Sequence, residues 1–195
     1  MNTKKIGLIA LVAGAIIALL FYFGYNSFVK LDEEVNNKWA EIQNSYQRRT
    51  DLIPSLVNVV KGSTEYEKNV LKELTEARSK AGQVNTSVIS HDAYQQQETA
   101  QGNITANLNK VIAVVENYPD LQSTNQFKTL QSQLEGTERR IKFARKDFNT
   151  AVMEYNKKVR SFPWNMVGGV LGFKIKDGFT ADAGTQNAPE VKFTK

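Results

Sequence analysis

The sequence predicts an all-α protein in which an N-terminal transmembrane helix precedes an up-and-down antiparallel bundle of four helical segments. Three observations predict this fold: an uncharged apolar run at Ile6–Tyr25, apolar residues that recur every three or four positions beyond it, and a heptad pattern from about Thr124 to Arg160. A helix with one apolar stripe buries it against other helices. The 195 residues suffice for one domain with a core, preceded by an anchor.

The apolar run is long enough to cross a bilayer. Its 20 residues reach about 30 Å as a helix, the thickness of the hydrocarbon core. It ends in the aromatic-rich segment Phe21–Tyr25 and not in the small residues of a signal-peptidase site, so we expect residues 1–25 to be a retained anchor that contacts the bilayer through residues 6–25. Lys4 and Lys5 favour a cytoplasmic N-terminus, which predicts a single-pass protein of the cytoplasmic (inner) membrane with its bulk outside the cytoplasm.

A first buried stripe follows the anchor without an intervening loop signal. Pro54 should bend this helix, because proline lacks an N–H and clashes with the preceding turn. Gly62 is either a reversal, which gives four alternating helices, or a bend within one long helix, which gives three rods. The stripe consists of Phe28, Leu31, Val35, Trp39, Ile42, Tyr46, Ile53, Leu56 and Val60, with Arg49 in its gap.

Three further helices are predicted. Thr64 and Glu67 have capping-box spacing before a second helix that ends near Gly82, and a third runs from about Asp92 to Asn117. The fourth carries the heptads, whose seams pack inside up-and-down bundles or pair with another chain as a coiled coil. Its first seam is Phe127, Leu134, Ile141, Phe148 and Tyr155, and its second is Leu130, Thr137, Ala144 and Ala151.

Pro163 ends the fourth helix and introduces an uncharged apolar stretch, Trp164–Phe173. This stretch has three possible roles. It is a hydrophobic lid on the bundle, or, if Gly62 reverses the chain towards the bilayer, an interfacial anchor. If Gly62 does not reverse the chain, the stretch lies at the distal end and is a contact for a partner or a second copy. Residues 174–195 show no periodicity and are predicted to be a disordered tail, so the bundle domain is expected to span residues 26–173.

Composition argues against several kinds of activity. The absence of cysteine excludes disulfides, thiolate metal sites and a cysteine nucleophile. The net charge of +5 comes from cations scattered among nearly as many carboxylates, which argues against nucleic-acid binding. His91, the only histidine, is a poor metal ligand by itself. No catalytic, cofactor-binding or metal-ligating residues are predicted, because no pairing of nucleophile and base is recognisable.

The best candidates for an interaction surface surround the arginine that interrupts the first stripe. A guanidinium there needs a carboxylate, because burying an unpaired charge is too costly, and Glu67, Glu135 and Glu138 are the candidates. Arg49 either forms an intramolecular ion pair that sets helix register or waits for a partner protein. The candidate interaction residues are Arg48, Arg49, Asp51, Pro54, Trp164 and Phe173.

Long collinear motifs resemble those of the LemA family. The resemblance covers about residues 25–173, and only Thr50 and Phe148 depart from the usual pattern. The motifs are Trp39–Ile42, Gln47–Gly62, Glu116–Leu121, Thr137–Arg145, Asp147–Asn149, Phe162–Pro163 and Gly172–Phe173.

The resemblance implies a bacterial single-pass membrane protein with a four-helix domain and no shared enzymatic activity. Relatives include a protein of the magnetosome membrane, and others are linked to envelope proteases or envelope stress. We therefore expect a non-enzymatic scaffold or interaction protein of the cell envelope that binds other envelope proteins and forms a homo-oligomer. The alternative is a regulatory adaptor of a membrane protease or an envelope-stress pathway. A hydrolase would require carboxylates that act together without a recognisable motif.

Overall fold

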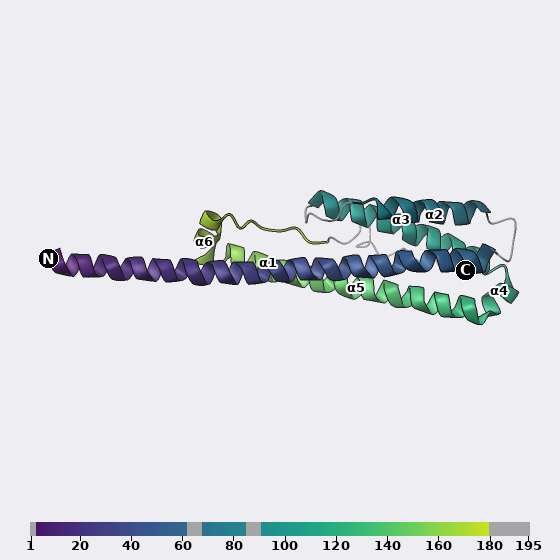
Figure 1. The fold of residues 1–195 in the computed structure, drawn as a ribbon, viewed down its shortest axis with the longest axis horizontal. Coiled ribbons are helices and arrows are strands. Elements are labelled where there is room, and N and C mark those ends of the chain that lie inside the picture. Colours follow the sequence, from purple (N-terminus) through teal and green to yellow (C-terminus); the bar gives the residue numbers. More distant parts are fainter. Residues whose placement is uncertain (1–2, 62–67, 85–90, 180–195) are drawn as a thin grey trace, which may run out of the picture.

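The computed structural model describes residues 3–61, 68–84 and 91–179, and within these ranges it contains helices and no strands. The predicted all-α fold, a long apolar N-terminal helix followed by a helical bundle, is confirmed (Figure 1). The helices are α1 (Thr3–Lys61), α2 (Lys68–Gly82), α3 (His91–Val115), α4 (Pro119–Ser123), α5 (Asn125–Arg160) and α6 (Trp164–Leu171).

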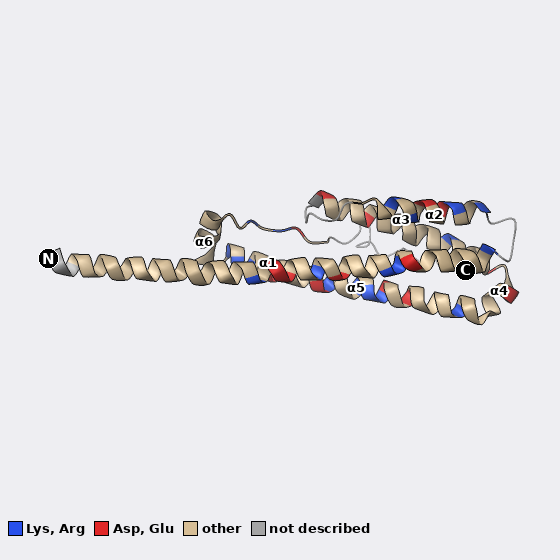
Figure 2. Ribbon diagram, viewed as in Figure 1, with Lys and Arg blue, Asp and Glu red and all other residues tan. Residues whose placement is uncertain are grey.

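Helix α1 joins the apolar run and the first bundle helix in one rod. Its 59 residues correspond to a length of about 88 Å at 1.5 Å per residue. The helix continues past Pro54 to Lys61, and Figure 1 draws it as one unbroken ribbon. It is the one helix among the described residues that is long and apolar enough to cross a membrane. Beyond the grey residues at its N-terminal end, Figure 2 shows α1 without charged residues up to the level of α6.

The helices alternate in direction. In Figure 1, α2 runs back along the distal half of α1, α3 runs away again, and α5 returns beside α1 towards the apolar end. The chain therefore reverses between Lys61 and Lys68, as the four-helix alternative requires. Gly62, Thr64 and Glu67, on which the predicted turn and capping box depended, lie outside the described residues.

The bundle consists of two helical pairs, α1 with α5 and α2 with α3. The heptad seams of α5 are buried inside the chain and are therefore not free for an intermolecular coiled coil. Two hydrophobic cores fill the bundle. The distal core is built around Ile53, Leu56, Leu74, Ile104, Val111 and Phe127. The proximal core, which lies nearer the apolar run of α1, is built around Val35, Trp39, Ile42, Tyr94, Phe148 and Tyr155.

The segment 174–179 corrects the prediction that the chain is disordered from Lys174 onward. Two asparagines of α5, seven residues apart, each form a pair of hydrogen bonds with its backbone. Asn156 donates to the carbonyl of Lys176 (2.7 Å) and accepts from its N–H (2.8 Å), and Asn149 does the same with Phe179 (3.0 and 2.8 Å). Lys176 also pairs with Asp32 of α1 at 2.8 Å. Apolar periodicity cannot reveal such a segment, because hydrogen bonds hold its backbone.

Candidate functional site

A buried polar layer around Arg49 lies between the two cores. Arg49 is only 2% exposed although arginine normally stays in water. Its guanidinium donates to Glu138 of α5 (2.5 Å), to the Thr105 hydroxyl of α3 (2.9 Å), and to both the backbone carbonyl (3.2 Å) and the side-chain oxygen of Gln101. One side chain of α1 thus connects both helical pairs of the bundle.

Of the three carboxylates considered as partners for Arg49, Glu138 is the one that pairs with it. Glu67 lies outside the described residues, and Glu135 is exposed and accepts from Gln131. The pair is asymmetric, because the Glu138 side chain is 45% exposed while Arg49 is buried. Glu138 is thus partly solvated, whereas the guanidinium depends on its protein partners.

The other candidate residues near Arg49 face away from the bundle interior. Arg48, Asp51 and Pro54 are exposed on the outer side of α1, and Asp51 accepts a hydrogen bond from Gln47 at 2.7 Å. The predicted cluster is therefore divided: Arg49 belongs to the interior, and the other three belong to an exposed strip. We call Arg48, Asp51 and Pro54 the outer strip.

Pro54 creates a further contact that sequence reasoning missed. Proline has no N–H, so in a helix the carbonyl four residues earlier, here that of Thr50, loses its usual donor. Arg78 of α2 donates to this carbonyl through Nε at 3.1 Å. The signal was present as Pro54 itself, but the identity of the donor depends on which helix packs there.

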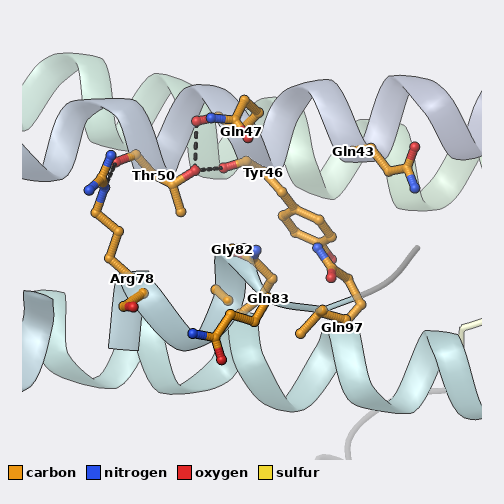
Figure 3. A pocket seen from close by; sticks show the side chains of 12 residues that line it. Gln43, Tyr46, Gln47, Thr50, Arg78, Gly82, Gln83 and Gln97 are labelled. Carbon is orange, nitrogen blue, oxygen red and sulfur yellow. Dashed lines mark hydrogen bonds between the residues drawn. The ribbon is translucent and has the colours of Figure 1, made fainter. Parts of the chain in front are cut away.

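A polar cleft of about 490 Å³ opens beside this contact, between α1 and the α2–α3 pair. Figure 3 shows Arg78 reaching the Thr50 backbone, with Gln83 and Gln97 lining the opposite side. Its walls are amides, hydroxyls and a guanidinium, and no carboxylate is among the lining residues. A cleft with this lining offers many hydrogen-bond donors and acceptors.

Helix α6 forms the second candidate site, where it packs against the end of the apolar run. Val167 and Trp164 lie so close to Gly24 that a Cβ built there would be 2.9 Å from Val167 Cγ1. A Cβ on Gly168 would lie 3.0 Å from the Phe28 ring. Two glycines thus permit close approach of the two helices, which positions the candidate residue Trp164 on α1.

The other candidate residue of this region, Phe173, packs under α6. Its ring stacks on Phe28 with centroids 4.8 Å apart and lies 6.2 Å from the ring of Tyr25. Lys158 of α5 places its ammonium 3.6 Å from the centre of the Trp164 ring, and burial lowers the pKa of this lysine. The apolar stretch is therefore a structured helix and turn at the level where the apolar run of α1 ends.

Tyrosines dominate the perturbed ionisable groups. Burial raises the pKa of Tyr155 to about 12, and burial is also the main cause that raises the pKa of Tyr46 and Tyr94. No group of three or more metal-binding side chains occurs among the residues that the structure describes. His91 begins α3, and its side chain lies outside the described part.

Comparison with known proteins identifies relatives. A family model described as the LemA family matches residues 38–193. The chain is 26% identical over 174 residues to the magnetosome proteins MamQ 1 and MamQ 2 of Paramagnetospirillum magneticum strain AMB-1. It is 25% identical over 174 residues to the magnetosome protein MamQ of Magnetospirillum gryphiswaldense strain MSR-1. Each match covers 80% of this chain, which spans only 64% of the length of these curated relatives.

Proposed function

The chain belongs to the LemA family, and from this premise we propose that it is a non-enzymatic, membrane-anchored scaffold that holds other proteins at the bacterial cell envelope. The single observation that carries the proposal is the continuity of α1. One helix contains the exposed apolar run and also buries Val35, Trp39 and Ile42 in the bundle core. No loop separates the apolar run from the bundle, so the bundle is a rigid continuation of the proposed anchor.

The outer strip is the surface that we assign to protein partners. Its residues, two charged and one apolar, are exposed on the outer side of α1. A scaffold of this kind presents an exposed face to its partners while its buried seams maintain the rod. We propose that this face binds other envelope proteins and that copies of the chain associate as a homo-oligomer.

Lys4 and Lys5 support an orientation in which the bundle lies outside the cytoplasm. Protease treatment of a C-terminal tag in intact spheroplasts tests this orientation, with disrupted cells as the control. Digestion in spheroplasts is expected. Protection in spheroplasts with cleavage after disruption would place the bundle in the cytoplasm and contradict the orientation.

Site-specific photo-crosslinking tests the scaffold role. A photoreactive amino acid replaces Arg48 or Asp51 in the full-length chain, and Lys72, an exposed residue of α2, is the control position. We expect discrete adducts with envelope proteins from the outer strip and fewer from Lys72. The absence of adducts from the outer strip would contradict the proposal. Adducts with a membrane protease would support the adaptor role instead, provided that the activity of this protease changes when the chain is deleted.

Co-expression of two differently tagged copies tests self-association separately. We expect each tag to recover the other from solubilised membranes. Recovery of one tag alone would contradict the homo-oligomer.

A further inference from the structure

Helix α6 is placed where a transmembrane protein meets the lipid headgroups. Figure 1 shows α6 lying across α1, beyond the end of α5 and nearest to the apolar end of the rod. It touches α1 at Gly24, one residue before the uncharged apolar run ends at Tyr25. If α1 spans the bilayer, α6 therefore lies beside the interfacial end of the span, with its own axis across the rod.

The outer face of α6 is apolar although none of the residues that the structure describes covers it. Met166 and Val170 are one helical turn apart and are 65% and 75% exposed. Phe162 before the helix is 80% exposed, and Ile175 after it is 64% exposed. In the span, Tyr22 and Phe23 are also exposed near the same level. Together these residues extend the exposed apolar surface from the end of the span onto α6.

The chain around α6 is also strongly basic. Between Tyr155 and Lys176 it contains five cations and no carboxylate: Lys157, Lys158, Arg160, Lys174 and Lys176. Lys176 is paired with Asp32 and Lys158 lies over Trp164, whereas Lys157 and Arg160 are exposed in the last turn of α5. Exposed cations beside apolar residues are the arrangement by which peripheral helices bind anionic bilayers.

We propose that α6 is a second membrane contact, seated in the headgroup region of the leaflet that α1 leaves. Met166 and Val170 enter the interface between headgroups and acyl chains, and Lys157 and Arg160 contact lipid phosphates. The inference rests on the proposed membrane anchoring and adds a function to it. Because α1 and α6 contact the bilayer at two points, the tilt of the bundle relative to the membrane is fixed.

The continuity with the span identifies the occupant of this surface as lipid. In the proposed anchoring, a docked protein would need to reach Met166 and Val170 at the membrane surface, where lipid would surround the exposed Tyr22 and Phe23. In the bilayer the four exposed apolar residues would lose contact with water without a rearrangement of the fold, because α6 is already packed against α1 at Gly24 and Gly168.

Nitroxide accessibility in the full-length chain tests the proposal directly. The chain contains no cysteine, so Met166→Cys and Val170→Cys give single labelling sites in nanodiscs that contain anionic phosphatidylglycerol. Phe143→Cys is the matched control, because Phe143 is an equally exposed apolar residue, 62% exposed, on α5 away from α6. Ile16→Cys reports separately whether the span is inserted.

We expect labels at 166 and 170 to collide more with oxygen, which concentrates in lipid, than with a water-soluble nickel chelate, and the label at 143 to show the reverse. Preferential collision with the chelate at 166 and 170 while 16 is buried in lipid would overturn this inference alone. Preferential collision with the chelate at 16 as well would overturn the proposed anchoring. Protection from both reagents with dipolar broadening between labels would identify a second copy as the occupant and also overturn the inference.

Discussion

The Nε–H of Arg78 in α2 donates a hydrogen bond to the backbone carbonyl of Thr50 in α1 at 3.1 Å. This carbonyl is the one that the pyrrolidine ring of Pro54 deprives of a helical donor. The proline and the arginine thus act as one feature, in which a gap in the hydrogen bonding of α1 becomes an attachment point for α2. Few direct contacts join α2 to α1, so this bond helps to position the α2–α3 pair.

A double-mutant cycle tests the dependence of this bond on the proline. Arg78→Leu should lower the free energy of unfolding by about 1 kcal/mol, the net value of one hydrogen bond. In a Pro54→Ala background the loss should disappear, because the new N–H donates to Thr50. Chemical denaturation of the full chain in detergent, followed by circular dichroism, measures all four proteins. Lys80→Ala is the control, and an Arg78 effect that is equal in both backgrounds would contradict the coupling.

The Arg49–Glu138 pair should respond unequally to loss of its two partners. Glu138→Leu leaves a buried guanidinium without its carboxylate and should cost about 3 kcal/mol, the lower end of the usual range, because Gln101 and Thr105 still accept from Arg49. Arg49→Met leaves a carboxylate that is already half in water and should cost less. The double variant should be more stable than Glu138→Leu alone. An equal cost for both single variants would show that the asymmetry in burial does not govern this pair.

Removal of the Tyr94 hydroxyl from the proximal core should not lower the free energy of unfolding. The Tyr94 hydroxyl is buried and has no hydrogen-bond partner within the described residues, while its ring packs on Trp39 and Phe148 with centroids 4.9 and 5.4 Å apart. Tyr94→Phe keeps the ring contacts and should raise the free energy of unfolding by up to about 1 kcal/mol. Phe148→Ala, which should cost about 3–5 kcal/mol, is the control for assay sensitivity. Destabilisation by Tyr94→Phe would reveal a partner for the hydroxyl.

Buried tyrosines should make the bundle sensitive to alkaline pH. Unfolded tyrosine ionises near its ordinary pKa of about 10, and burial raises the pKa of Tyr155 to about 12 in the folded chain. A raised pKa contributes stability that is fully present below pH 10 and lost as pH rises to about 12. Tyr46 and Tyr94 shift in the same direction. The absorbance of the tyrosine phenolate band and the helical circular dichroism should change together over this window. Full ionisation with an intact helical signal would contradict this account.

Substitution by alanine should have opposite effects on stability at the adjacent glycines Gly168 and Gly169 of α6. A Cβ on Gly168 would lie 3.0 Å from Phe28, whereas one on Gly169 would meet nothing within 4 Å. Gly168→Ala should therefore lower stability by about 1–3 kcal/mol and loosen α6, and Gly169→Ala should raise it by about 0.5–1 kcal/mol. Limited proteolysis between Ser161 and Lys174 measures the release of α6. Equal cleavage of the two variants would show that α6 does not depend on this contact.

Periodicity was sufficient to predict every major helix. Almost all residues of the predicted stripe from Phe28 to Val60 and of the heptads from Phe127 to Tyr155 are buried in the structure. A regular apolar repeat defines one face of a helix irrespective of the partner that covers it. The uncharged run at 6–25 likewise predicted the one helix, among the residues that the structure describes, that is long and apolar enough to span a membrane. These features are local, and each is specified by a few neighbouring turns.

The candidate site needed the tertiary structure. Sequence alone placed Arg48, Arg49, Asp51 and Pro54 in one cluster, with Arg49 in the gap of the buried stripe. The tertiary structure divided this cluster, because the helix turns about 100° per residue and the other three side chains lie on the exposed side of α1. The sequence named three possible carboxylates, and the packing of α5 against α1 selected Glu138. The roles of Arg78 and Gln101 had no local signal, since each depends on a contact more than 25 residues away along the chain.

The same division applies to the C-terminal part of the bundle. The apolar composition of Trp164–Phe173 was evident, but its position beside Gly24 followed only from the reversal between α1 and α2 and the return of α5. Residues 174–179 carry no repeat that predicts order, and two asparagines of α5 supply it through the backbone. Apolar spacing therefore determines which helices form. The direction of each turn and the pairing of buried polar groups are long-range properties, because they depend on which surfaces the folded chain brings together.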